Sequence, residues 1–166
     1  MSNETLSVLT STTSLLVSIA VFWVAFSQMK IASAKVKLDL YNRRFNIYQI
    51  TLDYYFSLWN DPYPTVTEKS FLFTKAFRES KFLFKDNDNV YKTLEKIHKK
   101  GAKIRFYKEY KYEMEHNLTK DKLDLGTLHK ESSEALLELE NDLMALENYI
   151  QKYIQFNSTS GWSLFK

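Results

Sequence analysis

The sequence predicts an all-α protein, with an N-terminal transmembrane helix that continues into a cytoplasmic antiparallel four-helix bundle. Only 3 glycines and 2 prolines occur among 166 residues, so long helices meet few interruptions. Apolar residues recur every three or four positions in successive segments, which is the period of one helix face. We expect four regions: a short external N-terminus (1–5), a transmembrane helix (6–29), the bundle (30–156) and a flexible tail with an apolar end (157–166).

The transmembrane helix is predicted from a run without charge. No Asp, Glu, Lys or Arg occurs from Thr5 to Met29. At about 1.5 Å per residue, a helix of this length crosses a hydrocarbon core of about 30 Å. Cleaved export signals begin with basic residues, whereas this run is preceded by Glu4. The run therefore favours a single-pass anchor in a lipid bilayer.

The charges beside this run predict its orientation. Basic residues crowd its C-terminal flank with only Asp39 opposing them, and they are Lys30, Lys35, Lys37, Arg43 and Arg44. Positive flanks stay on the cytoplasmic side of a membrane. We expect a bacterial inner (plasma) membrane protein with its N-terminus outside and its C-terminal domain in the cytoplasm.

Small and polar residues share one stripe of the predicted transmembrane helix. Alternating steps of three and four residues, with Val21 filling one place, place on it Ser7, Ser11, Ser14, Ser18, Ala25 and Gln28. Such a stripe lets neighbouring membrane helices approach closely, which favours a homo-oligomer. It could also line the water-filled lumen of a pore. A third interpretation is that the hydroxyls only bond their own backbone.

The first helix of the bundle is expected to continue from the anchor, because no helix breaker precedes Pro62. A seam of apolar side chains is predicted to face the core, formed by Leu38, Tyr41, Phe45, Tyr48, Leu52, Tyr55 and Trp59. A turn follows at residues 60–64. The capping-box pattern Thr65-x-x-Glu68 then predicts the start of a second helix that carries five phenylalanines, namely Phe71, Phe73, Phe77, Phe82 and Phe84.

Two further helices are predicted after a break at residues 86–89. The first runs from Val90 to about Asn117. Gly101 inside it could end one helix and start another, or let a neighbour pack closely, and we favour one continuous helix. The second carries an apolar face at strict three- and four-residue spacing, formed by Leu136, Leu139, Leu143, Leu146, Ile150 and Tyr153. Successive helices with short connections predict antiparallel neighbours.

Charge is divided between these last two helices. Basic residues predominate from Lys92 to Lys111, and every charged residue from Glu131 to Glu147 is acidic. The two helices could neutralise each other as antiparallel neighbours. Alternatively, a basic face could bind RNA or anionic lipid, through Lys96, Lys99, Lys100, Lys103 and Arg105. No motif for DNA accompanies this face, and we expect no DNA partner.

Enzyme chemistry has weak candidates. Glu95-x-x-His98 and Glu113-x-x-His116 match the carboxylate–imidazole pair of di-iron bundles, but lysines surround the first pair and both lie on one predicted helix. No arginine precedes a histidine by the spacing used in HEPN ribonucleases, and the chain has no cysteine. We therefore expect no enzymatic activity, no metal and no other cofactor.

The residues that follow the anchor carry a resemblance. The segment KVKLDLYNRRFNIYQ at residues 35–49 resembles a Leu-Asp-Leu-Tyr-x-Arg-Arg-Phe-x-Ile-Tyr pattern of small bacterial membrane-anchored helical proteins. The overall plan is also similar to the accessory membrane proteins of RNA-targeting CRISPR systems. That similarity implies a degenerate HEPN-like domain, a homo-oligomeric pore and a defence-system protein or RNA as a partner.

Together these features predict a membrane-anchored, self-associating helical protein that perturbs or gates the inner membrane, as an antiphage-defence effector or accessory. The alternative is a membrane-tethered scaffold whose cytoplasmic bundle binds a protein or RNA partner without catalysis. The two functions differ in the role of the anchor, since only the first requires its stripe of small residues.

Overall fold

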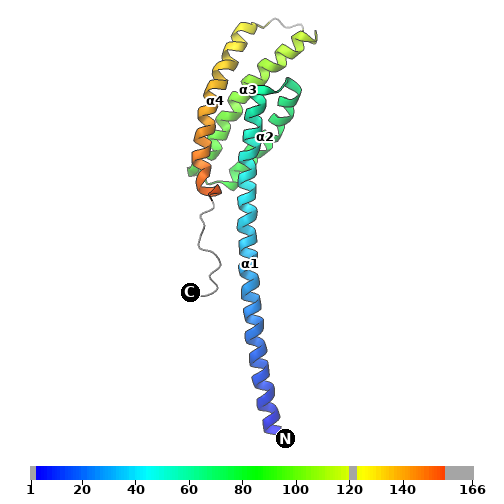
Figure 1. The fold of residues 1–166 in the computed structure, drawn as a ribbon, viewed down its shortest axis with the longest axis vertical. Coiled ribbons are helices and arrows are strands. Elements are labelled where there is room, and N and C mark those ends of the chain that lie inside the picture. Colours follow the sequence, from blue (N-terminus) through cyan, green and yellow to red (C-terminus); the bar gives the residue numbers. More distant parts are fainter. Residues whose placement is uncertain (1–2, 120–122, 156–166) are drawn as a thin grey trace. The chain divides into compact units, whose positions relative to one another are not determined.

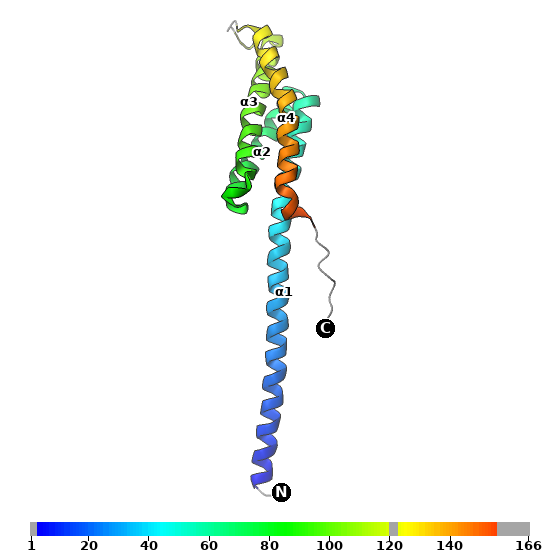
Figure 2. The same ribbon diagram turned by 90° about the vertical axis from the view of Figure 1, so that its left-hand side faces the viewer.

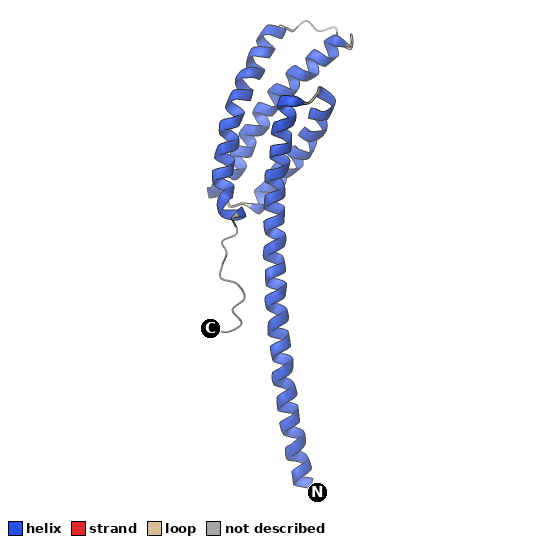
Figure 3. Ribbon diagram, viewed as in Figure 1, coloured by secondary structure: helices blue, strands red, loops and turns tan. Residues whose placement is uncertain are grey.

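The computed structural model describes residues 3–119 and 123–155, and every regular element within them is a helix (Figure 3). The elements are α1 (Asn3–Asn60), α2 (Tyr63–Leu83), the short 3-10 helix η1 (Asp86–Asp88), α3 (Val90–Glu115) and α4 (Leu125–Ile154), in the order marked in Figure 1. The predicted all-α class is confirmed. The predicted tail at 157–166 lies outside the described residues.

The chain divides into two compact units, Met1–Leu40 and Tyr41–Lys166. The described part of the first unit is a single stretch of α1, and from Val8 to Leu38 its large apolar side chains are exposed. The second unit contains the remainder of α1 and all of the other helices. Where burial is described, all of the buried core residues lie in this second unit.

Neighbouring helices of the second unit run antiparallel. On α1, Arg44 contacts Leu83 near the end of α2, whereas Tyr54 stacks on Phe73 near the middle of α2. The same residue Arg44 lies against Tyr153 near the end of α4. Helix α3 packs against both α2 and α4, and α3 and α4 lie side by side in both views (Figures 1 and 2).

The core of the second unit is aliphatic and aromatic. Its largest fully buried side chains come from every α-helix of the unit and include Tyr54, Phe73, Leu58, Leu94, Ile97, Ile104, Leu139, Leu146 and Ile150. Each such side chain contributes about 1.5–3 kcal/mol when it leaves water. Of the predicted apolar face of α4, Leu139, Leu143, Leu146 and Ile150 are buried, and Leu136 and Tyr153 are half-buried against the core.

The buried face of α1 differs from the predicted seam by one residue. Of the predicted residues, Leu38 and Trp59 are exposed. Half-buried positions are occupied by Tyr41, Phe45, Tyr48, Leu52 and Tyr55. The fully buried face is formed by Ile47, Thr51, Tyr54 and Leu58. Thr51 looks polar in the sequence, but its hydroxyl donates to the carbonyl of Ile47 at 2.7 Å and needs no other partner.

The start of α2 was also predicted wrongly. The helix begins at Tyr63 with Pro62 at its N-cap and Pro64 within the first turn, so Thr65 caps nothing. Proline is favoured at the start of a helix because the N–H that it lacks has no partner within the first turn. Of the five predicted phenylalanines, Phe73, Phe77 and Phe84 are buried, but Phe71 and Phe82 are 63% and 84% exposed.

Gly101 lies inside one continuous α3, as predicted, and it allows α1 to approach closely. A Cβ atom at Gly101 would lie 2.4 Å from the hydroxyl of Tyr54 and 2.7–2.9 Å from two of its ring atoms. The Tyr54 ring cannot retreat easily, because it is 1% exposed and stacks on Phe73 at 4.8 Å between centroids. The absence of a side chain at residue 101 therefore sets the distance between α1 and α3.

Gly101→Ala should lower the free energy of unfolding by roughly 1–2 kcal/mol, because the clash with Tyr54 exceeds the helix-propensity gain of alanine. Tyr54→Phe in the same chain removes the nearest atom and should recover part of the loss. Gly126→Ala is the matched control, since a Cβ there meets only Asp124 at 3.2 Å. Chemical denaturation measures all three. Equal stability of the parent and Gly101→Ala would contradict this close contact.

Candidate functional site

The residues of the predicted stripe on α1 are exposed, from Ser7 to Gln28. Two of their hydroxyls bond back to the helix: Ser11 donates to the carbonyl of Ser7 at 2.9 Å, and Ser18 donates to that of Ser14 at 2.8 Å. This is the geometry by which a hydroxyl is tolerated in an apolar environment. The hydroxyl donors of Ser11 and Ser18 are therefore satisfied within the helix.

The apolar surface of α1 has no cover within the described residues. By length and composition α1 is the only described helix able to cross a membrane, and none of its most apolar stretch is buried. Exposed large side chains surround the helix and include Leu15, Leu16, Val17, Ile19, Phe22, Trp23 and Val24. An apolar surface of this size in water is unfavourable, so a lipid or protein environment is required to stabilise it.

The structure divides the predicted basic face of α3. Lys96, Lys99 and Lys103 are exposed. Lys100 instead bridges to α4, with its Nζ 2.7 Å from Asp142 and 2.9 Å from Glu138. Burial alone would lower the pKa of Lys100, but the hydrogen bonds that its Nζ donates to both carboxylates outweigh this effect and raise the pKa.

Arg105, the last member of the predicted basic face, turns away from it. Its side chain is partly buried and lies 3.9 Å from Glu109 of the same helix. Glu109 also accepts a hydrogen bond from the hydroxyl of Tyr63 on α2. The mutual neutralisation of α3 and α4 holds for Lys100, and an exposed basic stripe remains at Lys96, Lys99 and Lys103.

The two Glu-x-x-His pairs do not converge. Within the described residues no three His, Cys, Asp or Glu side chains form a group that could hold a metal ion. His98 instead stacks on Phe77 and Phe73, at 5.4 and 6.2 Å between ring centroids. His116 stacks on Tyr112 at the end of α3.

Three segments of the second unit meet at Arg44 of α1, in a contact that we name the Arg44 clamp. The Nε of Arg44 donates to the carbonyl of Leu83 at 2.9 Å. Its guanidinium lies 4.3 Å from the ring centroid of Tyr153 and 5.7 Å from that of Phe84. Asp88 completes the clamp by accepting hydrogen bonds from Tyr153 and Lys152. The clamp thus joins α1, the end of α2, η1 and the end of α4.

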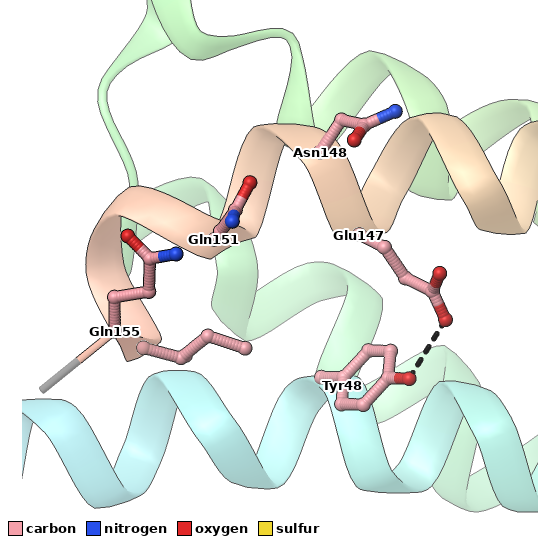
Figure 4. Close-up of a pocket in the computed structure, with 6 residues that line it drawn as sticks. Tyr48, Glu147, Asn148, Gln151 and Gln155 are labelled. Atoms are coloured by element: carbon pink, nitrogen blue, oxygen red, sulfur yellow. Dashed lines mark hydrogen bonds between the residues drawn. The ribbon is translucent and has the colours of Figure 1, made fainter.

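One turn further along α1 lies a shallow groove beside Tyr48, which we name the Tyr48 groove. It has a volume of about 570 Å³ and is lined by Tyr48, Glu147, Asn148, Gln151, Ile154 and Gln155. Figure 4 shows Tyr48 reaching from α1 toward Glu147 of α4, and the hydroxyl donates to Glu147 Oε1 at 2.8 Å. Burial, followed by the bond to Glu147, raises the pKa of Tyr48 to about 12, so the phenol stays protonated.

Sequence reasoning missed the clamp and the groove as sites. Arg44 and Tyr48 fall within the segment at 35–49 that carries the resemblance, where the pattern could have drawn attention to them. In the sequence Asp88 lies in a polar turn, and Glu147 is one of several acidic residues of the last helix. Their partners come from distant segments, which a spacing pattern within one helix does not reveal.

Arg44→Ala should lower the free energy of unfolding by roughly 2 kcal/mol, because one charged hydrogen bond and two ring contacts are lost. Arg43→Ala is the matched control. The side chain of Arg43 is 58% exposed and lies 3.9 Å from Glu79, and interactions of such exposed charges contribute little, so its loss should cost less than about 0.5 kcal/mol. Thermal and chemical unfolding of both variants check the contrast. Equal effects at the two adjacent arginines would show that the clamp does not stabilise the unit.

The stability of the second unit should fall at acidic pH through His98. Burial lowers the pKa of His98 below its ordinary value of 6.5, Arg78 and Arg105 add to the shift, and Glu95 opposes it. The folded state therefore favours neutral imidazole, and stability that is complete above 6.5 is lost as the pH falls from 6.5 toward the folded-state pKa. His98→Gln should reduce the loss between about pH 8 and about pH 5, measured by denaturant midpoints. An unchanged pH profile in this variant would contradict the assignment.

No protein family model, curated protein or solved structure matches this chain. A helical fold by itself does not identify an activity, because one architecture hosts many functions. A function is therefore inferred from four features of the chain: the uncovered apolar surface of α1, the exposed basic stripe of α3, the Arg44 clamp and the Tyr48 groove.

Proposed function

We propose that this chain is a single-pass membrane protein that self-associates and thereby perturbs or gates the inner membrane, as an antiphage-defence effector or accessory. The uncovered apolar surface of α1 is the observation that carries the proposal. A core helix of a soluble protein would be mostly buried, whereas the most apolar stretch of α1 is entirely unburied. A bilayer supplies the environment that this surface requires.

Self-association is supported by the side chains of the stripe. Small residues at Ser7, Ser11, Ser14 and Ser18 let two backbones come close, and the bulky Leu16 and Trp23 lie away from them. The hydroxyls of Ser11 and Ser18 already donate to their own helix, so these two residues can meet lipid or a neighbour without an unsatisfied donor. A ring of such helices that turned its hydroxyls to a lumen would conduct ions.

The second unit is assigned to the cytoplasm, as an antiparallel four-helix bundle. The assignment rests on the cluster of basic residues after Met29 and on the antiparallel contacts at Arg44 and Tyr54. The defence role rests on the resemblance of the segment at 35–49 and of the overall plan to small accessory membrane proteins.

A second candidate function is a tethered scaffold, and the exposed basic stripe of α3 favours it. Lys96 and Lys103 present two cations on one side of a helix, and Lys99 beside them pairs with Glu95 at 2.7 Å. Clustered cations attract an RNA backbone or an acidic protein. In this function the anchor only fixes the location. Replacement of residues 6–29 by an unrelated anchor would preserve a scaffold and abolish a gate.

Ser11, Ser14 and Ser18 changed together to leucine should abolish ion leakage while membrane insertion is retained, because three leucines separate the helices at the stripe. Leakage is measured as loss of membrane potential in cells and as ion release from vesicles that contain the purified chain. The expected rate in the variant is that of protein-free vesicles.

The matched control changes Thr12, Thr13 and Ser27 to leucine, which alters three hydroxyl residues on other sides of the same helix. This control should leak like the parent. Leakage that persists in the stripe variant, or that disappears equally in both variants, would count against a gate built on the stripe.

A further inference from the structure

We infer that the second units of neighbouring copies dock through Phe82 of one copy and the Tyr48 groove of the next. The inference deepens the proposed self-association and rests on it, but it is carried by different residues. It assigns the partner as a second copy of this chain. It also assigns the contact as heterologous, with different surfaces of the two copies facing each other.

Phe82 is the projecting side of this contact. It is 84% exposed, the most exposed large apolar side chain in the described residues. Along α2 it shares one face with Phe71, Lys75 and Arg78, at steps of four, three and four residues. Lys75 lies 4.7 Å from the centroid of the Phe71 ring, so the face combines exposed aromatics with cations. Faces of this composition are enriched at protein interfaces.

The Tyr48 groove is the receiving side. Its volume of about 570 Å³ accommodates a phenyl ring together with a neighbouring side chain. The ring of Tyr48 and the side chain of Ile154 provide apolar contact, and the amides of Gln151 and Gln155 form a polar rim in Figure 4. An aromatic side chain that enters such a pocket is a typical centre of an interface.

The two surfaces lie at the same level of the unit. Arg44 contacts Leu83 of α2 and Tyr153 of α4 together, and both helices run antiparallel to α1, so they are parallel to each other. Counting about 1.5 Å per residue back from these contacts, Phe82 is level with the groove at Gln151 and Ile154. Contact between Phe82 of one copy and the groove of the next therefore requires no shift of the copies along the helices.

Charge is complementary at the same level. Arg78 lies one helical turn before Phe82, and Glu147 lies about one turn before Gln151. Arg78 is exposed and carries no carboxylate contact within 4 Å in the described residues, where Glu147 accepts only the Tyr48 hydroxyl. When Phe82 occupies the groove, Arg78 faces Glu147 of the next copy. Because the two sides of the contact differ, repeated docking gives a ring or an open chain of copies.

Cysteine cross-linking tests this contact without background, because the chain has no cysteine of its own. Two separately tagged full-length copies are coexpressed in membranes, one with Phe82→Cys and one with Gln151→Cys, and are mildly oxidised. The expected product is a mixed dimer. A chain that carries both changes should give a ladder beyond the dimer, since a heterologous contact repeats. Lys96→Cys paired with Gln151→Cys is the matched control and should give no mixed dimer.

Charge exchange provides a second measurement on the same pair. Glu147→Arg in the Gln151→Cys copy should reduce the mixed dimer by about tenfold, because Arg78 then meets a like charge. Arg78→Glu in the Phe82→Cys copy should restore it. Absence of the mixed dimer, equal cross-linking by the Lys96 control, or failure of the charge exchange to restore it would overturn the inference.

A cysteine placed in the predicted transmembrane helix distinguishes failure of this inference from failure of the proposed function. Ser14→Cys copies that cross-link while Phe82→Cys and Gln151→Cys do not would support the span contact and overturn the groove contact. Loss of both would count against self-association altogether. An intrachain cross-link of Trp162→Cys to Gln151→Cys, without the mixed dimer, would assign the groove to the chain's own tail and overturn docking by a second copy.

Discussion

The apolar surface of α1 has to leave water, and the proposed function depends on this requirement. From Val8 to Leu38 the helix exposes valine, leucine, isoleucine and aromatic side chains, and the described residues bury none of its most apolar stretch. The hydrophobic effect at about 25 cal/mol per Å² makes such a surface costly in water. A bilayer, further copies of the chain, or both together meet the requirement. The proposed membrane location and the proposed self-association both follow from this one constraint.

The second unit meets the opposite demand, since it buries its own core and leaves only selected surfaces open. Tyr54 against Gly101 sets the approach of α1 to α3, and the Arg44 clamp ties α1 to the ends of α2 and α4. A helix held at both places has a defined register within the unit. This register also fixes the positions of the exposed features along the helices. The clamp places Phe82 and the Tyr48 groove at one level of the unit.

Much of the fold could be predicted from spacing, and the misses have physical causes. The regular leucines of α4 and the continuity of α3 through Gly101 were read correctly, because one helix face in contact with one core leaves a clear period. On α1 the prediction followed the bulky Tyr48, Leu52 and Tyr55, whereas the buried face contains Thr51 and Ser57, whose hydroxyls donate to carbonyls of the same helix. Polarity alone therefore predicts the wrong face, because backbone carbonyls of α1 satisfy the hydroxyls of Thr51 and Ser57.

The candidate site was less predictable than the fold. The spacing of the basic residues in α3 predicts one basic surface. In the structure Lys100 bridges to Asp142 of α4, and Arg105 lies near Glu109 of its own helix. A contact such as the one between Lys100 and Asp142 depends on packing between helices, which spacing within one helix does not reveal.

The mass of the full-length chain solubilised in mild detergent tests the central claim most directly. Self-association predicts a complex at a multiple of 19.7 kDa that remains after dilution. A particle of 19.7 kDa with its bound detergent, at every protein concentration, would contradict it.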